Sequence, residues 1–197
     1  MATIVIEEMR FAFSLHGGGT CLHGPEAATQ TFLKGALLVF SAGYIQECGA
    51  DPAAILGVAA EDGHNDTTAG TSQIKYYPLT GNVFEANLAQ AAANTTSATT
   101  DLGTKYGVIK RSTGTAHWVV DSAETSSTRC VILNWARSTV ATDVNARVQI
   151  HFFQAGIGYA LNGTQHASLA PSDEQDGFAR KPRAAGAADA VHVGLCV

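Results

Sequence analysis

The clearest fold signal in this chain is at residues 33–60, LKGALLVFSAGYIQECGADPAAILGVAA. They contain three short apolar or alternating runs, at residues 37–41, 44–48 and 55–59, which are divided by Ala-Gly and by Gly-Ala-Asp-Pro. Glycine permits positive φ and proline fixes the backbone of a turn, so short runs divided in this way are typical of β-hairpins. The stretch therefore predicts three consecutive strands of a compact β-core.

The rest of the chain repeats this pattern. Five further runs predict strands: residues 73–77, 83–88, 116–121, 129–135 and 146–152. Short strands at a spacing of about 10 to 15 residues, without a helical apolar pattern, are typical of small barrels and sandwiches. We therefore predict an all-β fold, a small antiparallel β-barrel or sandwich, whose core spans residues 31–155 and carries extended arms at both ends.

The N-terminal arm is predicted at residues 1–30. Its apolar residues recur at every second position: Met9, Phe11, Phe13 and Leu15. This alternation gives a strand one apolar face, and His-Gly-Gly-Gly follows as a flexible hinge. Two interpretations stay open, an edge strand of the same core or an arm that pairs with the sheet of a neighbouring subunit.

The C-terminal extension is predicted at residues 156–197. It is mostly polar, but its last residues alternate again between apolar and other side chains: Val191, Val193, Leu195 and Val197. An apolar end after a polar linker predicts a segment that docks on its own core or on a neighbour. These four residues and the four of the N-terminal arm are the predicted contacts to neighbouring subunits.

Composition and charge exclude several classes of protein. The net charge is −5 and the pI is near 5.7, which gives no basic surface for nucleic acid. The N-terminal sequence MATIVIEEMRF carries two glutamates where a secretory leader needs apolar residues, and no run is long enough to span a membrane. We therefore expect a soluble protein made in the cytoplasm, with its four cysteines free and with Cys48 and Cys130 buried.

No motif for catalysis is present. The chain lacks a nucleophile elbow, a phosphate-binding loop, a dinucleotide fingerprint and a zinc-protease motif, and its seven histidines are scattered. Residues 61–66, Glu-Asp-Gly-His-Asn-Asp, are the densest group of possible cation ligands, but they lack the alternating spacing of an EF-hand. An exposed turn is the expected structure there, with a cation-binding loop as the alternative. We expect no enzymatic activity, no cofactor and no metal.

The order of five stretches resembles the decoration, or cement, proteins on the heads of tailed bacteriophages. The stretches are LKGALLVFSAGYIQECGADPAAILGVAAEDG, NVFEANLA, TDLGTKYGVIK, AHWVVDSAE and NARVQIHFF, within residues 31–153. The resemblance implies a β-tulip-like barrel on the outer face of an icosahedral capsid, commonly as a homotrimer, which ties major capsid protein subunits together and stabilises the head. It implies a virion location on the capsid exterior.

Two functions are consistent with these observations. The first is a structural capsid cement protein whose N-terminal arm and C-terminal residues bridge to neighbours. The alternative is a virion-surface β-domain that binds host glycan, with Trp118, Tyr76 or Tyr77 as stacking platforms. The alternative requires that these aromatic side chains be exposed.

Overall fold

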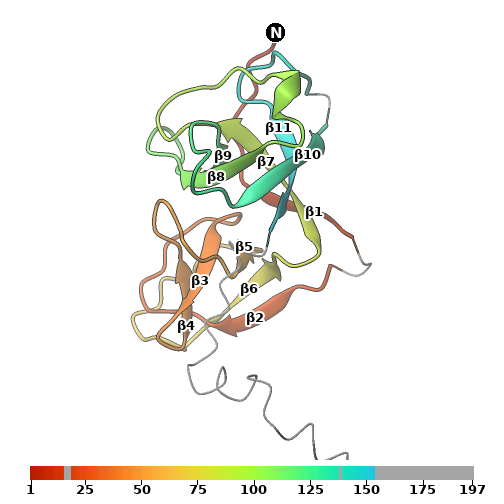
Figure 1. The fold of residues 1–197 in the computed structure, drawn as a ribbon. Helices are drawn as coiled ribbons and strands as arrows, with labels where there is room; N and C mark the ends of the chain where they lie inside the picture. Colours follow the sequence, from red (N-terminus) through yellow and green to blue (C-terminus); the bar gives the residue numbers. More distant parts are fainter. Residues whose placement is uncertain (16–18, 138, 154–197) are drawn as a thin grey trace, which may run out of the picture. The chain divides into compact units, whose positions relative to one another are not determined.

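The computed structural model of the chain describes residues 1–15, 19–137 and 139–153. These residues form eleven β-strands and one short 3₁₀ helix, η1 (Thr99–Asp101), which confirms the all-β prediction (Figure 1). No helix in this described part is long and apolar enough to cross a membrane. The strands are β1 (Arg10–Ser14), β2 (Leu22–Pro25), β3 (Leu37–Ser41), β4 (Tyr44–Glu47), β5 (Gly57–Ala59), β6 (Gln73–Pro78), β7 (Asn82–Ala89), β8 (Lys105–Lys110), β9 (Trp118–Asp121), β10 (Cys130–Trp135) and β11 (Arg147–Phe152).

Five strands close into a barrel in the order β7, β11, β10, β8 and β9, because β9 returns to pair with β7. Four of the pairings are antiparallel, and the closing pair, in which Leu88 lies opposite Val120, is parallel. The barrel is therefore mixed, whereas the sequence predicts a purely antiparallel arrangement. The reason is geometric, since five strands that alternate in direction cannot close without one parallel pair.

Strand β7 is the longest and holds the barrel together. One of its edges pairs with β11, and its other edge pairs first with β1, where Glu85 lies opposite Arg10, and then with β9. All eight of its residues, NVFEANLA, are buried. The polar residues Glu85 and Asn87 are buried together with their apolar neighbours, because Arg147 and the chain before β1 lie against them.

The stretch at residues 33–60 supplies the second sheet, whose antiparallel order is β2, β6, β5, β3 and β4. Strands β3 and β4 form a hairpin with Ser41 opposite Tyr44. Its two loop residues both have positive φ, 50° at Ala42 and 90° at Gly43. Two-residue hairpin loops with positive φ at both positions match the twist of the flanking strands, so the predicted hairpin is confirmed.

Two features of the fold differ from the sequence prediction. Residues 1–30, predicted as an arm, contribute β1 to the barrel sheet and β2 to the second sheet. Strand β8 is not among the predicted strands, since its sequence KYGVIK has no clear alternation. The predicted C-terminal extension lies outside the described residues.

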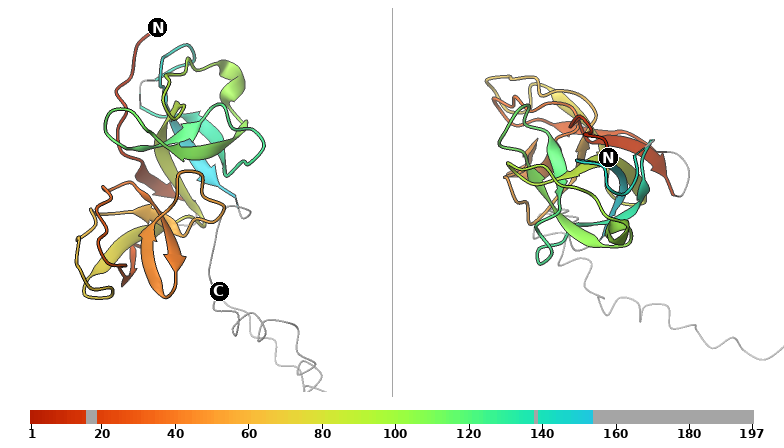
Figure 2. Two further views of the ribbon diagram at one scale, coloured as in Figure 1. Left: turned by 90° about the vertical axis from the view of Figure 1, so that its left-hand side faces the viewer. Right: turned by 90° about the horizontal axis from the view of Figure 1, so that it is seen from above.

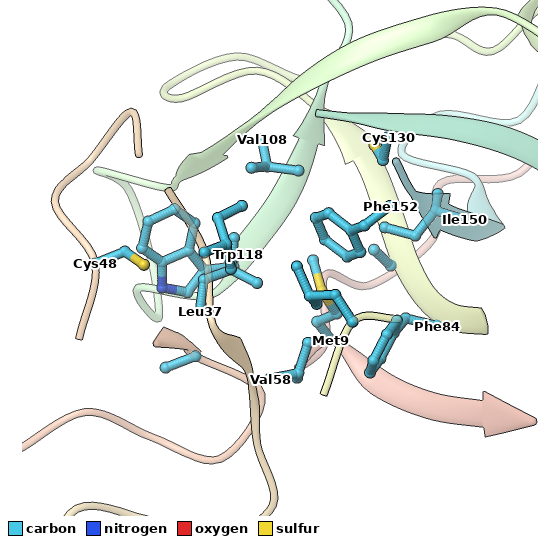
Figure 3. Packing of buried hydrophobic residues seen from close by; sticks show 14 of the residues in the cluster. Met9, Leu37, Cys48, Val58, Phe84, Val108, Trp118, Cys130, Ile150 and Phe152 are labelled. Carbon is cyan, nitrogen blue, oxygen red and sulfur yellow. The ribbon is translucent and has the colours of Figure 1, made fainter. Parts of the chain in front are cut away.

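Buried apolar side chains from both sheets form one hydrophobic core (Figure 3). Phe84 and Phe152 meet edge to face in it, with ring centroids 5.8 Å apart. Glu47 ties the second sheet to the barrel, because its carboxylate accepts from Trp118 Nε1 at 3.0 Å and from Lys110 Nζ at 2.7 Å. The indole N–H of a buried tryptophan needs such a partner.

Two of the cysteines belong to this core. Cys48 and Cys130 are 6% and 0% exposed, which confirms their predicted burial. Burial raises the pKa of each thiol to about 12. Both thiols are therefore neutral near pH 7 and unreactive as nucleophiles.

We expect Phe84→Ala to destabilise the protein by about 3 to 5 kcal/mol, because the substitution leaves a cavity between Phe11 and Phe152. The matched control is Leu133→Ala on β10, where the side chain is 45% exposed and the expected change is within about 0.5 kcal/mol. Urea unfolding measures both variants. Equal stabilities would contradict the packing described here.

Candidate functional site

The four N-terminal residues that were predicted to contact neighbours differ in their exposure to solvent. Met9 is 0% exposed and belongs to the core, so it has no surface to offer a neighbour, which corrects its predicted role. Phe11 stacks on Tyr77, with centroids 4.7 Å apart. Only Phe13 and Leu15, 43% and 50% exposed, present large apolar surface. The other predicted contacts lie outside the described residues: Val191, Val193, Leu195 and Val197.

A β-bulge explains why Phe11 and Phe13 differ. In the pairing of β1 with β7, Phe11 lies opposite Phe84, and the register shifts before Phe13. A bulge adds one residue to a strand and so changes which face the following side chains occupy. Phe13 therefore leaves the apolar face that regular alternation predicts. Two interpretations of this segment were open, an edge strand of the same core or an arm that pairs with a neighbouring subunit. In the structure, β1 is an edge strand of its own sheet.

The aromatic residues considered for glycan stacking are not available for it. Trp118 is 1% exposed and Tyr76 is 9% exposed. Tyr77 is occupied by the ring of Phe11. A stacking platform needs an exposed aromatic face, so these three residues do not form one.

The polar loop at residues 61–66 uses its side chains within the protein. Glu61 pairs with Lys75 at 3.2 Å, and Asp62 accepts from the Lys34 main-chain N–H at 2.6 Å. The His64 Nδ1 lies 2.6 Å from the carboxylate of Glu26. Among the described residues, no group of three or more His, Cys, Asp and Glu side chains is placed to hold a metal ion.

The most buried charge in the described residues is Arg147, at the start of β11, which is 1% exposed. Its Nη1 donates to Asn87 Oδ1 at 2.9 Å, and its Nη2 donates to the carbonyls of Glu8 at 2.6 Å and Glu85 at 3.2 Å. Its Nε lies 3.8 Å from the Glu85 carboxylate. Burial, and after it the nearby Arg137, lowers the pKa of Arg147 to about 10, so the guanidinium stays charged near pH 7.

The N-terminal segment, residues 2–9, is held against the barrel by this guanidinium and by main-chain bonds. Figure 2 shows it in red, running beside the barrel strands. The Ile4 N–H donates to the Val144 carbonyl at 2.9 Å, and the Val144 N–H donates to the Ala2 carbonyl at 2.7 Å. Asn87 binds the segment from β7, because its Oδ1 accepts from the Glu7 N–H at 3.1 Å. These bonds make the segment part of the folded unit.

A pocket of about 300 Å³ lies beside the N-terminal segment. Its walls come from the segment itself, from the loop that joins β8 to β9, and from two asparagines: Ile4, Ile6, Asn94, Arg111, Thr113, Gly114, Thr115, His117 and Asn145. Burial lowers the pKa of His117; Arg147 also lowers it, whereas Glu8 and Glu7 raise it. The pocket combines one guanidinium, one imidazole and several neutral hydrogen-bonding groups.

Sequence reasoning missed this pocket and the Arg147 network. Arg147 lies in an alternating strand, on the face opposite to the apolar side chains. An arginine at such a position normally faces solvent, so the sequence gives no sign that it is buried. Arg111 and His117 lie in a Ser-, Thr- and Gly-rich loop that has no motif. The sequence contains one indication, which is the scarcity of charge. Charged residues are only 15% of the chain, so a charged residue within a predicted strand is a candidate for a structural role.

The pocket offers hydrogen-bonding groups to a ligand. The guanidinium and amide groups among its lining residues can donate hydrogen bonds. Comparison of the chain with protein-family models, with curated proteins and with solved structures found no match. The geometry of the site therefore carries the functional argument.

We expect Arg147→Met to destabilise the protein by about 3 to 5 kcal/mol, because it takes the guanidinium donor from Asn87 Oδ1 and from the carbonyls of Glu8 and Glu85. The control, Lys75→Met, removes an exposed ion pair and should change stability by no more than about 1 kcal/mol. Urea unfolding measures both. A small effect of Arg147→Met would contradict the anchoring role.

Acidification should loosen the N-terminal segment through Asp143. Its carboxylate accepts from the main-chain N–H groups of Ala2 at 2.8 Å and Val140 at 3.1 Å, and these bonds lower its pKa from 3.8. Because the pKa is lower in the folded state, the stabilisation is complete above about pH 4 and is lost as the pH falls through the folded-state value. We expect Asp143→Asn to be less stable than wild type at pH 7, with the difference shrinking below about pH 3. A difference independent of pH would contradict this.

Proposed function

We propose that the protein is a non-catalytic structural protein that decorates the outside of an icosahedral phage capsid and cements neighbouring major capsid protein subunits. It acts as a homotrimer whose exposed apolar residues contact neighbours. The proposal rests on the resemblance of five ordered stretches to phage decoration proteins and on one structural observation, the apolar edge strand β1.

Strand β1 carries the proposal because it combines two properties of an interface. It ends the order of its sheet, so its outer edge is not paired by another strand of the described chain. Phe13 and Leu15, at that edge, are 43% and 50% exposed. An unpaired edge with large apolar side chains is a surface that favours pairing with another chain.

The anchoring of residues 2–9 supports a defined interface. Arg147, Asn87 and Val144 hold the segment before β1, so Phe13 and Leu15 leave the body of the protein at a fixed point. Contacts that are pre-organised lose little conformational entropy on binding. Weak contacts of this kind, repeated over a symmetric lattice, give a high total affinity and stabilise the assembled shell by mass action.

The direct test is occupancy on purified phage heads that lack the protein. The double variant Phe13→Ser and Leu15→Ser removes the exposed apolar surface but leaves Met9 and Phe11 in place. Burial of each large apolar side chain contributes about 1.5 to 3 kcal/mol, so we expect binding to weaken about a hundredfold or more. A deletion of residues 1–16 is unsuitable, because it would remove Met9 from the core.

The matched control is Leu102→Ser and Leu133→Ser, which removes two exposed leucines from other elements, 37% and 45% exposed. This variant should occupy heads as wild type does. Light scattering of the free protein measures the oligomeric state in parallel. Equal occupancy by the β1 variant would contradict the role of β1, and failure of the wild type to bind heads would overturn the proposed function.

A further inference from the structure

The pocket beside the N-terminal segment holds a buried cation without an anionic partner. Arg111 is 9% exposed, and no carboxylate among the described residues lies within ion-pair distance of it. Arg147, by contrast, is buried next to the Glu85 carboxylate. A buried charge without a counter-charge is costly, so the guanidinium of Arg111 is suited to receive an anion from outside the chain.

The hydrogen bonds of Arg111 leave one edge of its guanidinium unused. Nη1 donates to the carbonyls of Gln90 at 3.0 Å and Ala93 at 2.9 Å, and Nη2 donates once, to Thr113 Oγ1 at 3.0 Å. Nε and the second hydrogen of Nη2 have no partner in the described part of the chain. Nε and Nη2 are neighbours on the guanidinium, and such a pair of donors can bind both oxygens of one carboxylate.

The remaining lining favours a small polyhydroxylated ligand. Asn94 Nδ2, the Thr115 hydroxyl and the ring nitrogens of His117 form no hydrogen bond to another described residue, and they line the same pocket. Sugar hydroxyls both donate and accept, so they match such neutral groups. Ile4 and Ile6 add an apolar wall. A volume of about 300 Å³ is at the lower end of the range of small-molecule pockets, which favours about one sugar ring.

The charge balance favours a carboxylate over a phosphate. The pocket wall supplies one permanent positive charge, Arg111. Glu8 and Glu7 are close enough to raise the pKa of His117, and Arg147, which lowers it, already has the Glu85 carboxylate beside it. A singly charged carboxylate is neutralised by one guanidinium, whereas a phosphate near charge −2 would keep an excess of negative charge in a partly buried site.

We propose that this pocket binds an acidic sugar through a side-on pairing of its carboxylate with the Nε and Nη2 groups of Arg111. The sugar hydroxyls bind Asn94 and Thr115, and the ring lies against Ile4 and Ile6. This binding goes beyond capsid attachment and does not require it, since the pocket is complete within one chain.

Protonation of His117 strengthens the binding. A carboxylate in the pocket attracts the imidazolium form, and Glu7 and Glu8 favour that form too, whereas burial and the charge of Arg147 oppose it. Binding therefore takes up a proton, and the affinity rises as the pH falls through the pKa of His117 in the complex.

The test is calorimetric titration of the full chain with D-glucuronate and N-acetylneuraminate, with D-glucose and inorganic phosphate as reference ligands. At least one acidic sugar should bind saturably, about tenfold or more tightly than either reference ligand, because a charge-assisted bidentate pair is lost with glucose. Its affinity should be higher at about pH 5.5 than at about pH 8.

Absence of saturable binding by both acids would overturn the proposal, and glucose bound equally well would refute the role of the carboxylate. Phosphate bound equally well would show an oxyanion site without sugar recognition.

Two variants of Thr115 locate the binding without disturbing the fold, since its exposed side chain bonds no described residue. Thr115→Glu places a negative charge in the pocket and should weaken binding of the acidic sugar about tenfold or more. Thr115→Gln has nearly the same size as Thr115→Glu without the charge, so it should bind the acidic sugar about tenfold or more tightly than Thr115→Glu does. Thermal unfolding checks that both variants fold. Equal binding by the two variants would place the ligand elsewhere and overturn the proposal.

Discussion

One buried guanidinium, that of Arg147, links two barrel strands to the N-terminal segment. Arg147 reaches from β11 across β7 to the main chain of Glu8, and its positive charge lies beside Glu85 in the interior. The burial of a charged group costs several kcal/mol, which hydrogen bonds and an ionic partner must offset. Here Asn87, three carbonyl groups and the Glu85 carboxylate do so. The group therefore stabilises only one arrangement of β7, β11 and the N-terminal segment.

That arrangement decides what the N-terminus can do. With residues 2–8 fixed along the barrel, Met9 enters the core and β1 pairs with β7. The bulge in β1 then turns Phe13 out of the core face. The same segment supplies Ile4 and Ile6 to the wall of the pocket. The proposed interface and the proposed ligand site are thus two surfaces of one anchored segment, and both depend on the bonds that hold it.

The scarcity of charge in this chain has a structural consequence. Glu85 serves Arg10 and Arg137 as well as Arg147, and Glu47 serves both Lys110 and Trp118. Shared carboxylates of this kind join elements that are far apart in the sequence. Arg111 is the exception, because it is buried with neutral acceptors alone. The contrast with Arg147 distinguishes a structural cation from one suited to a ligand.

Local patterns in the sequence are enough to predict the all-β class and most of the strands, because hairpin turns and two-residue alternation are local properties of the chain. Residues 37–41 form β3 with the predicted bounds, and the Ala42-Gly43 turn lies where glycine requires it. The burial of Met9 and Arg147 and the exposure of Phe13 follow instead from tertiary contacts. Each of these three features depends on a bulge, a strand pairing or a distant carboxylate. Arg147, for example, binds Asn87, which is 60 residues away in the sequence. Local periodicity contains no information about such distant partners. The pocket was undetectable for the same reason, since its walls meet only when the barrel has closed.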